Sequence, residues 1–431
     1  SFRYSFKHQN YKKHKKTMQH ISSKLIHGNK STESKDKYNS LKTPIYQSAS
    51  FDFNNSNDME IAFRGESDAY TYSRISNPTV NALQNSLKTL SNADDVICVS
   101  SGMAAISNVF FTICQKGENI ITSNYLFGNT YSFFYSTLSS FGVDTKFIDL
   151  NNLDEIEKYI DKDTRAIFIE IPTNPQLIIY DIEAIANIAE KNNLLLIVDN
   201  SVLTPYLFES KKYKIDIEVF SNTKFISGGA TSIGGTILTY ESEKWSKIPK
   251  LENEYKQFGN KAFIKRLYGE IYRNIGACLS PSNAWLQLLG LETLTLRIDK
   301  VNENALKVAQ FLLNNEHVKS VEYSSLDESY QNNLSQKYFP KGAGALISLN
   351  LGTKEKCFKF MDSLKMIRRG TNFCDNKSMV IHPYSTIYWS LDDATKQNML
   401  IDEGLLRLSI GIEHITDLIE DLHQALEKTN F

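Results

Sequence analysis

The chain has 431 residues, of which 41% are hydrophobic and 23% are charged, and its formal net charge is −1. This length and composition are typical of a soluble globular protein of two or three domains, and the near-neutral charge argues against nucleic acid or an anionic membrane as a partner. The five cysteines are scattered and include no CxxC pair, which argues against disulfides or a metal site and favours a reducing cytoplasm. No run of about 18 apolar residues is present, so no transmembrane helix is expected.

The first 17 residues form a basic segment with six lysines and arginines and no acidic residue. They lack the apolar core of a secretory signal. An organelle transit peptide and a basic binding arm both remain open, but we expect residues 1–17 to be a disordered or non-native extension, because Met18 is a natural starting residue. Residues 18–65 show no regular pattern, and we expect them to form an N-terminal arm.

Residues 66–299 alternate between strand-like and helix-like stretches. The strand-like stretches are DDVICV, GENIITSN, DTKFIDL, TRAIFIEI, LLLIVD and IDIEVF. Amphipathic segments such as IEAIANIAEKNN lie between them, with apolar residues at spacings of three and four. This alternation predicts an α/β fold in which helices cover both faces of a mostly parallel sheet.

The pattern changes beyond about residue 300. VNENALKVAQFLLNN and KCFKFMDSLKMI are expected to be helices, and GALISLNL and LLRLSIGIE are expected to be strands. The last segment, ITDLIEDLHQALEKT, has a strong amphipathic helical pattern. Residues 300–431 are therefore predicted to form a separate, smaller α+β domain.

Polar residues collect where the expected strands end. Ligands bind at the carboxyl ends of strands in a mostly parallel sheet, and Ser101, Asn174, Asp199 and Lys224 all fall there. Lys224 lies in the stretch SNTKFISGGATSIGG, among hydroxyl groups and glycines. Because the lysine precedes the glycines, this stretch is not a nucleotide P-loop, in which the lysine follows them. The stretch nevertheless points to a phosphate-bearing partner.

These strand ends fit pyridoxal 5′-phosphate (PLP). The turn SSGM at 100–103 can present backbone N–H groups of a helix N-terminus to a phosphate, and Ser221 and Thr223 add hydroxyl donors. Asp199 ends a very apolar strand, where a carboxylate needs a cation such as a protonated pyridine nitrogen. Lys224 supplies an amine for a Schiff base. Taken singly, such an aspartate is more often a turn residue and such a lysine a solvated one, but their convergence favours the cofactor.

Three motifs resemble those of the Cys/Met-metabolism family of PLP-dependent enzymes. They are VDNSVLTPYLFESKKYKIDIEVFSNTKFISGGATSIGG at 198–235, YTYSRISNPTV at 70–80 and EIPTNP at 170–175. The resemblance extends from about Leu41 to the C-terminus. It implies a PLP enzyme of fold type I, with a cofactor-binding large domain at 66–299 and a smaller C-terminal domain at 300–431.

The resemblance also implies a role for each residue that matches a family motif. Lys224 holds PLP and carries protons, Asp199 pairs with the pyridine nitrogen, and Arg407 binds the substrate α-carboxylate. Tyr72 and Arg74 reach the phosphate of a neighbouring subunit, which implies a homo-oligomer with shared active sites, expected to be a dimer of dimers. The other cofactor-binding residues are Gly102, Met103, Asn174, Ser221 and Thr223.

Within the family, the C-terminal third is most similar to the O-acetylhomoserine sulfhydrylases. RLYGEIYRNIGACLSPSNAWLQLLGLETLTLR and NFCDNKSMVIHPYST carry this similarity, and Asn372 is assigned to substrate binding. The implied reaction replaces the acyl group of an O-acylated homoserine, expected to be O-acetyl-L-homoserine, by sulfide or a thiol to give homocysteine. A methionine or cystathionine γ-lyase, a cystathionine γ-synthase and a non-catalytic interaction protein remain as alternatives.

Two residues depart from the family pattern. Phe127 stands where the family usually has a tyrosine stacked on the cofactor. A phenylalanine ring can still stack, but it cannot transfer a proton, so any acid assistance to the leaving group must come from elsewhere. Cys374 stands where the sulfhydrylases usually have glycine.

Overall fold

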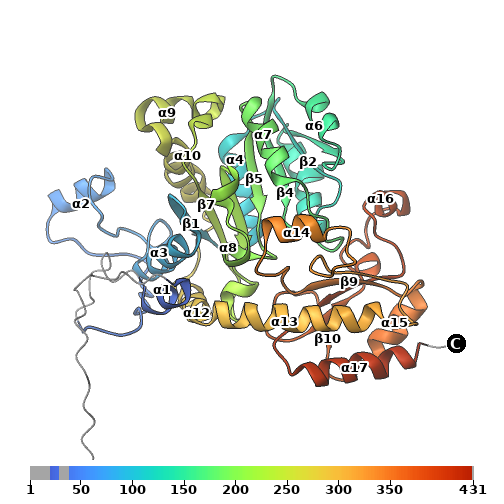
Figure 1. Ribbon diagram of the computed structural model, residues 1–431. Coiled ribbons are helices and arrows are strands. Elements are labelled where there is room, and N and C mark those ends of the chain that lie inside the picture. Colours follow the sequence, from blue (N-terminus) through green and yellow to red (C-terminus); the bar gives the residue numbers. More distant parts are fainter. Residues whose placement is uncertain (1–19, 29–37, 430–431) are drawn as a thin grey trace, which may run out of the picture.

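The computed structural model of the protein describes residues 20–28 and 38–429, so the basic extension at 1–17 lies outside the described residues. Figure 1 shows a large sheet enclosed by helices, and a second sheet beside α15 and α17 near the C-terminus. The α-helices are α1 (Ile21–His27), α2 (Ser56–Phe63), α3 (Pro78–Ser91), α4 (Gly102–Ile113), α5 (Gly128–Ser132), α6 (Leu153–Tyr159), α7 (Ile182–Lys191), α8 (Thr204–Leu207), α9 (Glu252–Phe258), α10 (Ala262–Arg266), α11 (Arg273–Ile275), α12 (Pro281–Glu292), α13 (Leu294–Leu313), α14 (Asn332–Tyr338), α15 (Lys354–Ser363), α16 (Asp393–Asn398) and α17 (Ile415–Glu427).

Among the described residues, the larger sheet has seven strands in the order β1-β7-β6-β5-β4-β2-β3. Strands β2 to β6 run parallel to one another, and β7 is antiparallel to its neighbours β1 and β6. The prediction of a mostly parallel sheet is thus confirmed. The strands are β1 (Asp95–Val99), β2 (Asn119–Ser123), β3 (Asp144–Ile148), β4 (Thr164–Glu170), β5 (Leu195–Asp199), β6 (Ile217–Ser221) and β7 (Gly235–Thr239).

Both faces of the large sheet are buried, as the apolar strands require. Side chains alternate between the two faces of a strand. Leu195 and Ile197 of β5 share a core with Phe110 of α4, whereas Leu196 and Val198 of the same strand share the opposite core with α7. The central strand β5 therefore consists of apolar residues up to its last residue, Asp199.

The smaller sheet belongs to the C-terminal part of the chain. In the described region its strand order is β10-β11-β12-β9-β8, and only the β10–β11 pair is parallel. Helix α13 runs without interruption through residues 299 and 300, where the sequence suggested a domain boundary. The strands are β8 (Ser320–Glu322), β9 (Leu346–Asn350), β10 (Arg368–Arg369), β11 (Met379–Ile381) and β12 (Leu405–Ser409).

The N-terminal segment is more regular than its sequence indicated. The expectation of no regular pattern at 18–65 is wrong for α1 and α2. Helix α1 buries Leu25 and packs against α3 and α12, and α2 begins at a cap in which Asn55 accepts the Asp58 N–H. Helices of two turns contain too few residues to show a clear apolar period, so local capping and tertiary packing define them.

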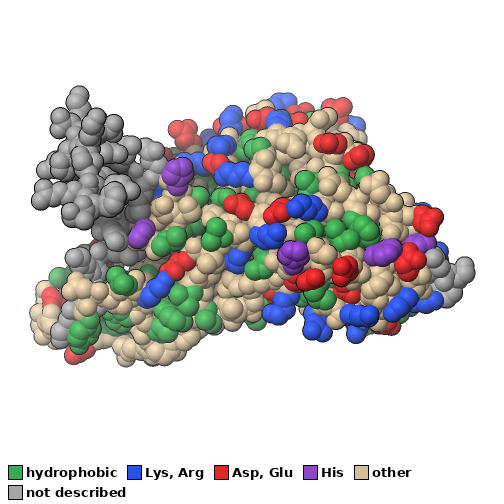
Figure 2. Space-filling model, turned by 60° about the horizontal axis from the view of Figure 1, so that its bottom comes forward, with side chains coloured by type: hydrophobic (Ala, Val, Ile, Leu, Met, Phe, Trp, Pro, Cys, Tyr) green, Lys and Arg blue, Asp and Glu red, His purple; other side chains and the backbone are tan. Residues whose placement is uncertain are grey.

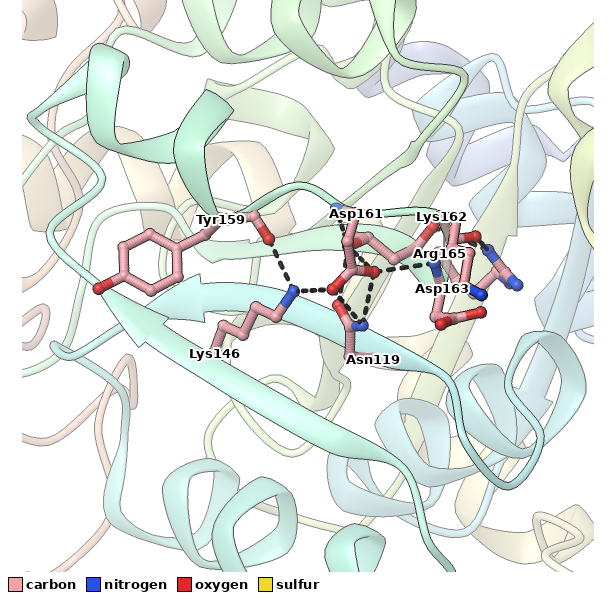
Figure 3. Close-up of polar contacts among 8 residues, drawn as sticks. Asn119, Lys146, Tyr159, Asp161, Lys162, Asp163 and Arg165 are labelled. Atoms are coloured by element: carbon pink, nitrogen blue, oxygen red, sulfur yellow. Dashed lines mark hydrogen bonds and ion pairs between the residues drawn. The ribbon is translucent and has the colours of Figure 1, made fainter.

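The amino ends of β2, β3 and β4 are tied together by polar side chains (Figure 3). Asp161, in the turn before β4, accepts hydrogen bonds from Lys146 Nζ at 2.5 Å and from Asn119 Nδ2 at 3.0 Å. It also accepts the Asp163 N–H at 2.8 Å and the Thr164 hydroxyl at 3.2 Å. One carboxylate therefore joins three neighbouring strands at the edge away from their carboxyl ends.

Charges of both signs lie on the face that Figure 2 displays, where Lys and Arg are interleaved with Asp and Glu. Within residues 20–28 and 38–429, no helix is both long and apolar enough to cross a membrane. In the same ranges, no group of three or more His, Cys, Asp or Glu side chains could hold a metal ion.

Candidate active site

A cavity of about 210 Å³ lies at the carboxyl ends of the central strands. Strand β4 ends at Glu170, β5 at Asp199 and β6 at Ser221, while α4 begins at Gly102, shortly after β1. The sheet therefore brings together residues that are far apart in the sequence. The predicted site residues that line the cavity are Gly102, Met103, Phe127, Asn174, Asp199, Ser221, Thr223 and Lys224.

The Lys224 amine points toward residues of the C-terminal part of the chain. Its Nζ donates to Asn372 Oδ1 at 2.6 Å and lies 4.0 Å from the centre of the Phe373 ring. The Asn372 amide is itself held by Asp375, to which its Nδ2 donates at 3.2 Å. Burial and, to a smaller extent, the charge of Arg407 lower the pKa of Lys224 to about 8. A lysine with this pKa can act as a nucleophile or a base near neutral pH.

Asp199 is a half-buried carboxyl that lines the cavity. Its Oδ1 accepts the Ser201 N–H at 2.9 Å, and Ser201 Oγ in turn accepts the Ser221 N–H at 2.8 Å. Burial raises the pKa of Asp199, whereas hydrogen bonds from Ser201 and the charge of Lys224 lower it. A ligand cation in the cavity would stabilise the ionised form of this carboxyl.

The opposite side of the cavity is suited to an anion. Ser101 caps α4 by accepting the Ala104 N–H at 3.0 Å, and the first turn of α4 leaves backbone N–H groups for a ligand. A Cβ on Gly102 would lie 2.9 Å from the Ser221 Cβ, so glycine is needed for α4 and the end of β6 to approach this closely. The hydroxyl groups of Ser221 and Thr223 border the same space.

Arg407, on β12, lies behind the residues that line the cavity. Its side chain is buried, and its Nη atoms donate to Asn174 Oδ1 at 3.2 Å and to the carbonyl oxygens of Thr371 at 2.9 Å and Asn372 at 3.1 Å. The Arg407 Nε is buried and has no hydrogen-bond partner among the described residues. Buried donors rarely stay unpaired, so this atom fits a carboxylate supplied by a ligand.

Tyr72 and Arg74 do not join these residues. Both side chains are exposed, and neither lines the cavity of its own chain. Arg74 donates to the Arg273 carbonyl at 2.6 Å, and its guanidinium lies 5.5 Å from the centre of the Tyr72 ring. Within a single chain, Tyr72 and Arg74 therefore lie away from the cavity. The sequence assigns both residues to the phosphate of a neighbouring subunit.

The structure adds residues that the sequence analysis did not assign to the site. Glu170, Ser201 and Phe373 all line the cavity. Glu170 could have been found from its position, because it ends β4 as Asp199 ends β5. Ser201 and Phe373 carry no comparable signal, since their contacts arise only when distant segments meet.

The residues that line the cavity fit PLP as a ligand. The cavity combines an anion site at the start of α4, the Asp199 carboxyl for a ring nitrogen, the Lys224 amine, and an aromatic face at Phe127. These are the partners that a phosphorylated pyridine aldehyde requires, and in the surrounding fold they define a PLP-dependent enzyme of fold type I. The sequence model of the Cys/Met metabolism PLP-dependent enzymes matches residues 22–427, and the chain belongs to this family.

Similar proteins cover almost the whole chain. The homocysteine/cysteine synthase of Saccharomyces cerevisiae is 32% identical over 433 residues, covering 95% of this chain and 98% of the yeast protein. An L-methionine gamma-lyase of Fusobacterium nucleatum is 32% identical over 396 residues, covering 91% and 95%. The crystal structure of a Campylobacter jejuni protein assigned as an O-acetylhomoserine (thiol)-lyase, with a pyridoxyl-lysine monophosphate, is 35% identical, covers 94% and 99%, and has a TM-score of 0.89.

Proposed function

We propose that this protein transfers sulfur to an O-acylated homoserine, with O-acetyl-L-homoserine as the main substrate. Sulfide or a thiol replaces the acetate at Cγ, and the products with sulfide are homocysteine and acetate. The observation that carries the proposal is a full-length similarity to a homocysteine/cysteine synthase and to an O-acetylhomoserine (thiol)-lyase. It is joined to a cavity that holds an amine and to a buried arginine nitrogen without a hydrogen-bond partner behind the cavity lining.

Each predicted site residue then has a defined task. PLP, when bound, supplies an electron-withdrawing ring that stabilises negative charge at the substrate α-carbon. Lys224 holds the cofactor, takes the α-proton and passes protons along the substrate, as its lowered pKa allows. Asp199 keeps the ring nitrogen protonated, and Phe127 stacks on the ring. Arg407 binds the substrate carboxylate through Nε.

The remaining contacts fix the cofactor and the lysine. Gly102, Met103, Ser221 and Thr223 bind the phosphate, and Asn174 contacts the ring. Asn372 was assigned to the substrate from the sequence. Its hydrogen bond to Lys224 Nζ supports a second task, which is to hold the amine in position between proton transfers.

The enzyme acts as a homo-oligomer, expected to be a dimer of dimers, in the cytoplasm. The exposed position of Tyr72 and Arg74 supports a role at the phosphate of a partner subunit. In hybrid dimers, an Arg74→Ala subunit paired with a Lys224→Ala subunit has one intact site, so activity should return on mixing. Hybrids that form and stay inactive would contradict a shared site.

The free state of all five cysteines supports a reducing compartment.

One assay tests the reaction directly. The purified holoenzyme is given O-acetyl-, O-succinyl- or O-phosphohomoserine, each with sulfide, with cysteine or with no sulfur donor. Homocysteine from O-acetylhomoserine and sulfide supports the proposal. A γ-lyase is the second candidate because an L-methionine gamma-lyase is 32% identical over 396 residues. It would instead form a 2-keto acid and ammonia without any sulfur donor, and cystathionine from cysteine would indicate a cystathionine γ-synthase.

A further inference from the structure

The peptide group between Leu126 and Phe127 is held at both of its polar ends. The Phe127 N–H donates to Glu170 Oε1 at 2.9 Å. The Tyr388 hydroxyl donates to the Leu126 carbonyl oxygen, also at 2.9 Å. Because a peptide group is planar, two hydrogen bonds on opposite sides fix the orientation of the plane from which the Phe127 side chain extends.

The same two side chains also hold Asn174. Glu170 accepts the backbone N–H of Asn174, and the Tyr388 hydroxyl lies 3.2 Å from the Asn174 carbonyl oxygen. Glu170 ends β4 of the large sheet, whereas Tyr388 lies between β11 and β12 of the smaller sheet. The two cavity-lining segments, one carrying Phe127 and one carrying Asn174, are therefore joined by one side chain from each part of the molecule.

Glu170 lies in register with Asp199 on the adjacent strand, and a neighbouring carboxylate disfavours the ionisation of a second carboxyl. The charge of Lys224 lowers the pKa of Asp199. Glu170 is hydrogen-bonded by the Phe127 and Asn174 N–H groups and the Thr130 hydroxyl, none of which is charged. Burial and the neighbouring Asp199 both raise the pKa of Glu170 well above its usual value.

We propose that Glu170 and Tyr388 form a clamp that sets the position of the Phe127 ring against PLP. A tyrosine at position 127 could be anchored through its own hydroxyl. Phe127 has no such group, so its ring can be oriented only through its backbone and by packing. Glu170 and Tyr388 are thus positioning residues that act through Phe127. The inference rests on PLP as the cofactor of this cavity and is independent of which substrate the enzyme uses.

Tyr388→Phe removes one half of the clamp with little change in volume. We expect PLP to dissociate roughly tenfold more readily, as for loss of one buried hydrogen bond, and the circular dichroism of the bound PLP to weaken at full occupancy. Tyr384→Phe is the matched control. Tyr384 lies in the same segment, but its hydroxyl donates to Asp393 at 2.7 Å, outside the segments that carry Phe127 and Asn174. Both readouts should therefore stay at the wild-type level.

Substitutions of Glu170, the other half of the clamp, test whether it positions Phe127 or only stabilises the fold. Glu170→Gln keeps a carbonyl oxygen for the Phe127 N–H and should retain PLP affinity and the cofactor's circular dichroism within about twofold, whereas Glu170→Ala should lose roughly tenfold in affinity.

A double-mutant cycle decides whether the clamp acts through Phe127. In a Phe127→Ala background the ring is gone, so adding Tyr388→Phe should cause no further loss of PLP affinity. Additive losses, or a Tyr388→Phe protein with unchanged affinity and circular dichroism, would overturn the proposal. If Tyr388→Phe does not fold, the same cycle is run with Glu170→Ala. All these measurements use PLP without substrate, so failure of the clamp is distinguishable from failure of the proposed reaction.

Discussion

Strand β4 has a carboxyl group at each end, and the two have opposite environments. Before its first residue stands Asp161, whose side chain is 48% exposed and pairs with Lys146. Its last residue is Glu170, which is buried and lies in register with Asp199 on the neighbouring strand. The same chemical group is thus used at one end to fasten three strands and at the other to build a binding site.

The pKa values follow this difference. Partial burial raises the pKa of Asp161, but hydrogen bonds from Lys146, Asn119 and the Asp163 N–H outweigh it and lower the pKa below its usual value. The pKa of Glu170 is raised by burial and by Asp199, with no cation to oppose either effect. At the amino edge, the Asp161 carboxylate is therefore satisfied by the protein itself, whereas at the carboxyl edge Glu170 and Asp199 border a cavity that a ligand can fill.

If this division holds, substitutions at the carboxyl edge change catalysis and those at the amino edge change stability. Lys224→Ala is expected to have the largest effect, because it removes the group that holds PLP and transfers protons. We expect kcat to fall by about 10²–10⁴-fold or more, since a positioned base usually contributes a factor in this range. Borohydride reduction and peptide mapping of the wild-type holoenzyme should find PLP on Lys224. A label on another lysine would make the assignment wrong.

The next largest effect is expected from replacing a planar guanidinium. Arg407→Lys keeps the charge but loses the Nε donor and the fork geometry, and we expect kcat/KM to fall by roughly 10- to 100-fold, the range of a charge-assisted hydrogen bond. The matched control is Arg165→Lys on β4, where Nε donates to Glu118 at 2.6 Å. That variant should melt at a lower temperature with unchanged kcat/KM. A loss of activity in the control, or none in Arg407→Lys, would contradict the division between the two edges.

Substitutions of Phe127 test how much stacking of its ring contributes to PLP binding and to the reaction. Phe127→Ala removes the stacking partner and should weaken PLP retention by about 0.5–1.5 kcal/mol, as for other aromatic pairs. Phe127→Tyr keeps the ring and should leave sulfur transfer within a few-fold of wild type. Both homocysteine and 2-keto acid are to be measured. A large gain in keto-acid formation by Phe127→Tyr would show that the missing hydroxyl normally suppresses elimination, and the stacking-only account would be wrong.

The carboxyl edge was largely predictable from the sequence because strand ends leave a clear signal. LLLIVD predicts a buried strand ending in Asp199, and SNTK places Lys224 just after the next one. Tyr388 was not predictable, because its two acceptors lie 262 and 214 residues away in the chain. Helices α1 and α2 were missed because tertiary packing and a single cap define them.

The smallest effect is expected from a substitution at the amino edge of the large sheet. Asp161→Asn removes an ion pair between a 48% exposed aspartate and a 23% exposed lysine, so we expect a loss of about 0.2–1 kcal/mol in the free energy of unfolding at neutral pH. The folded state lowers the pKa of Asp161 from its ordinary value of 3.8, so the stabilisation is present above that pH and is lost as the pH falls below it. The difference in urea unfolding between wild type and variant should therefore shrink below about pH 4, while PLP affinity and kcat/KM stay unchanged. A variant that is equally stable but less active would place Asp161 with the site rather than with the fold.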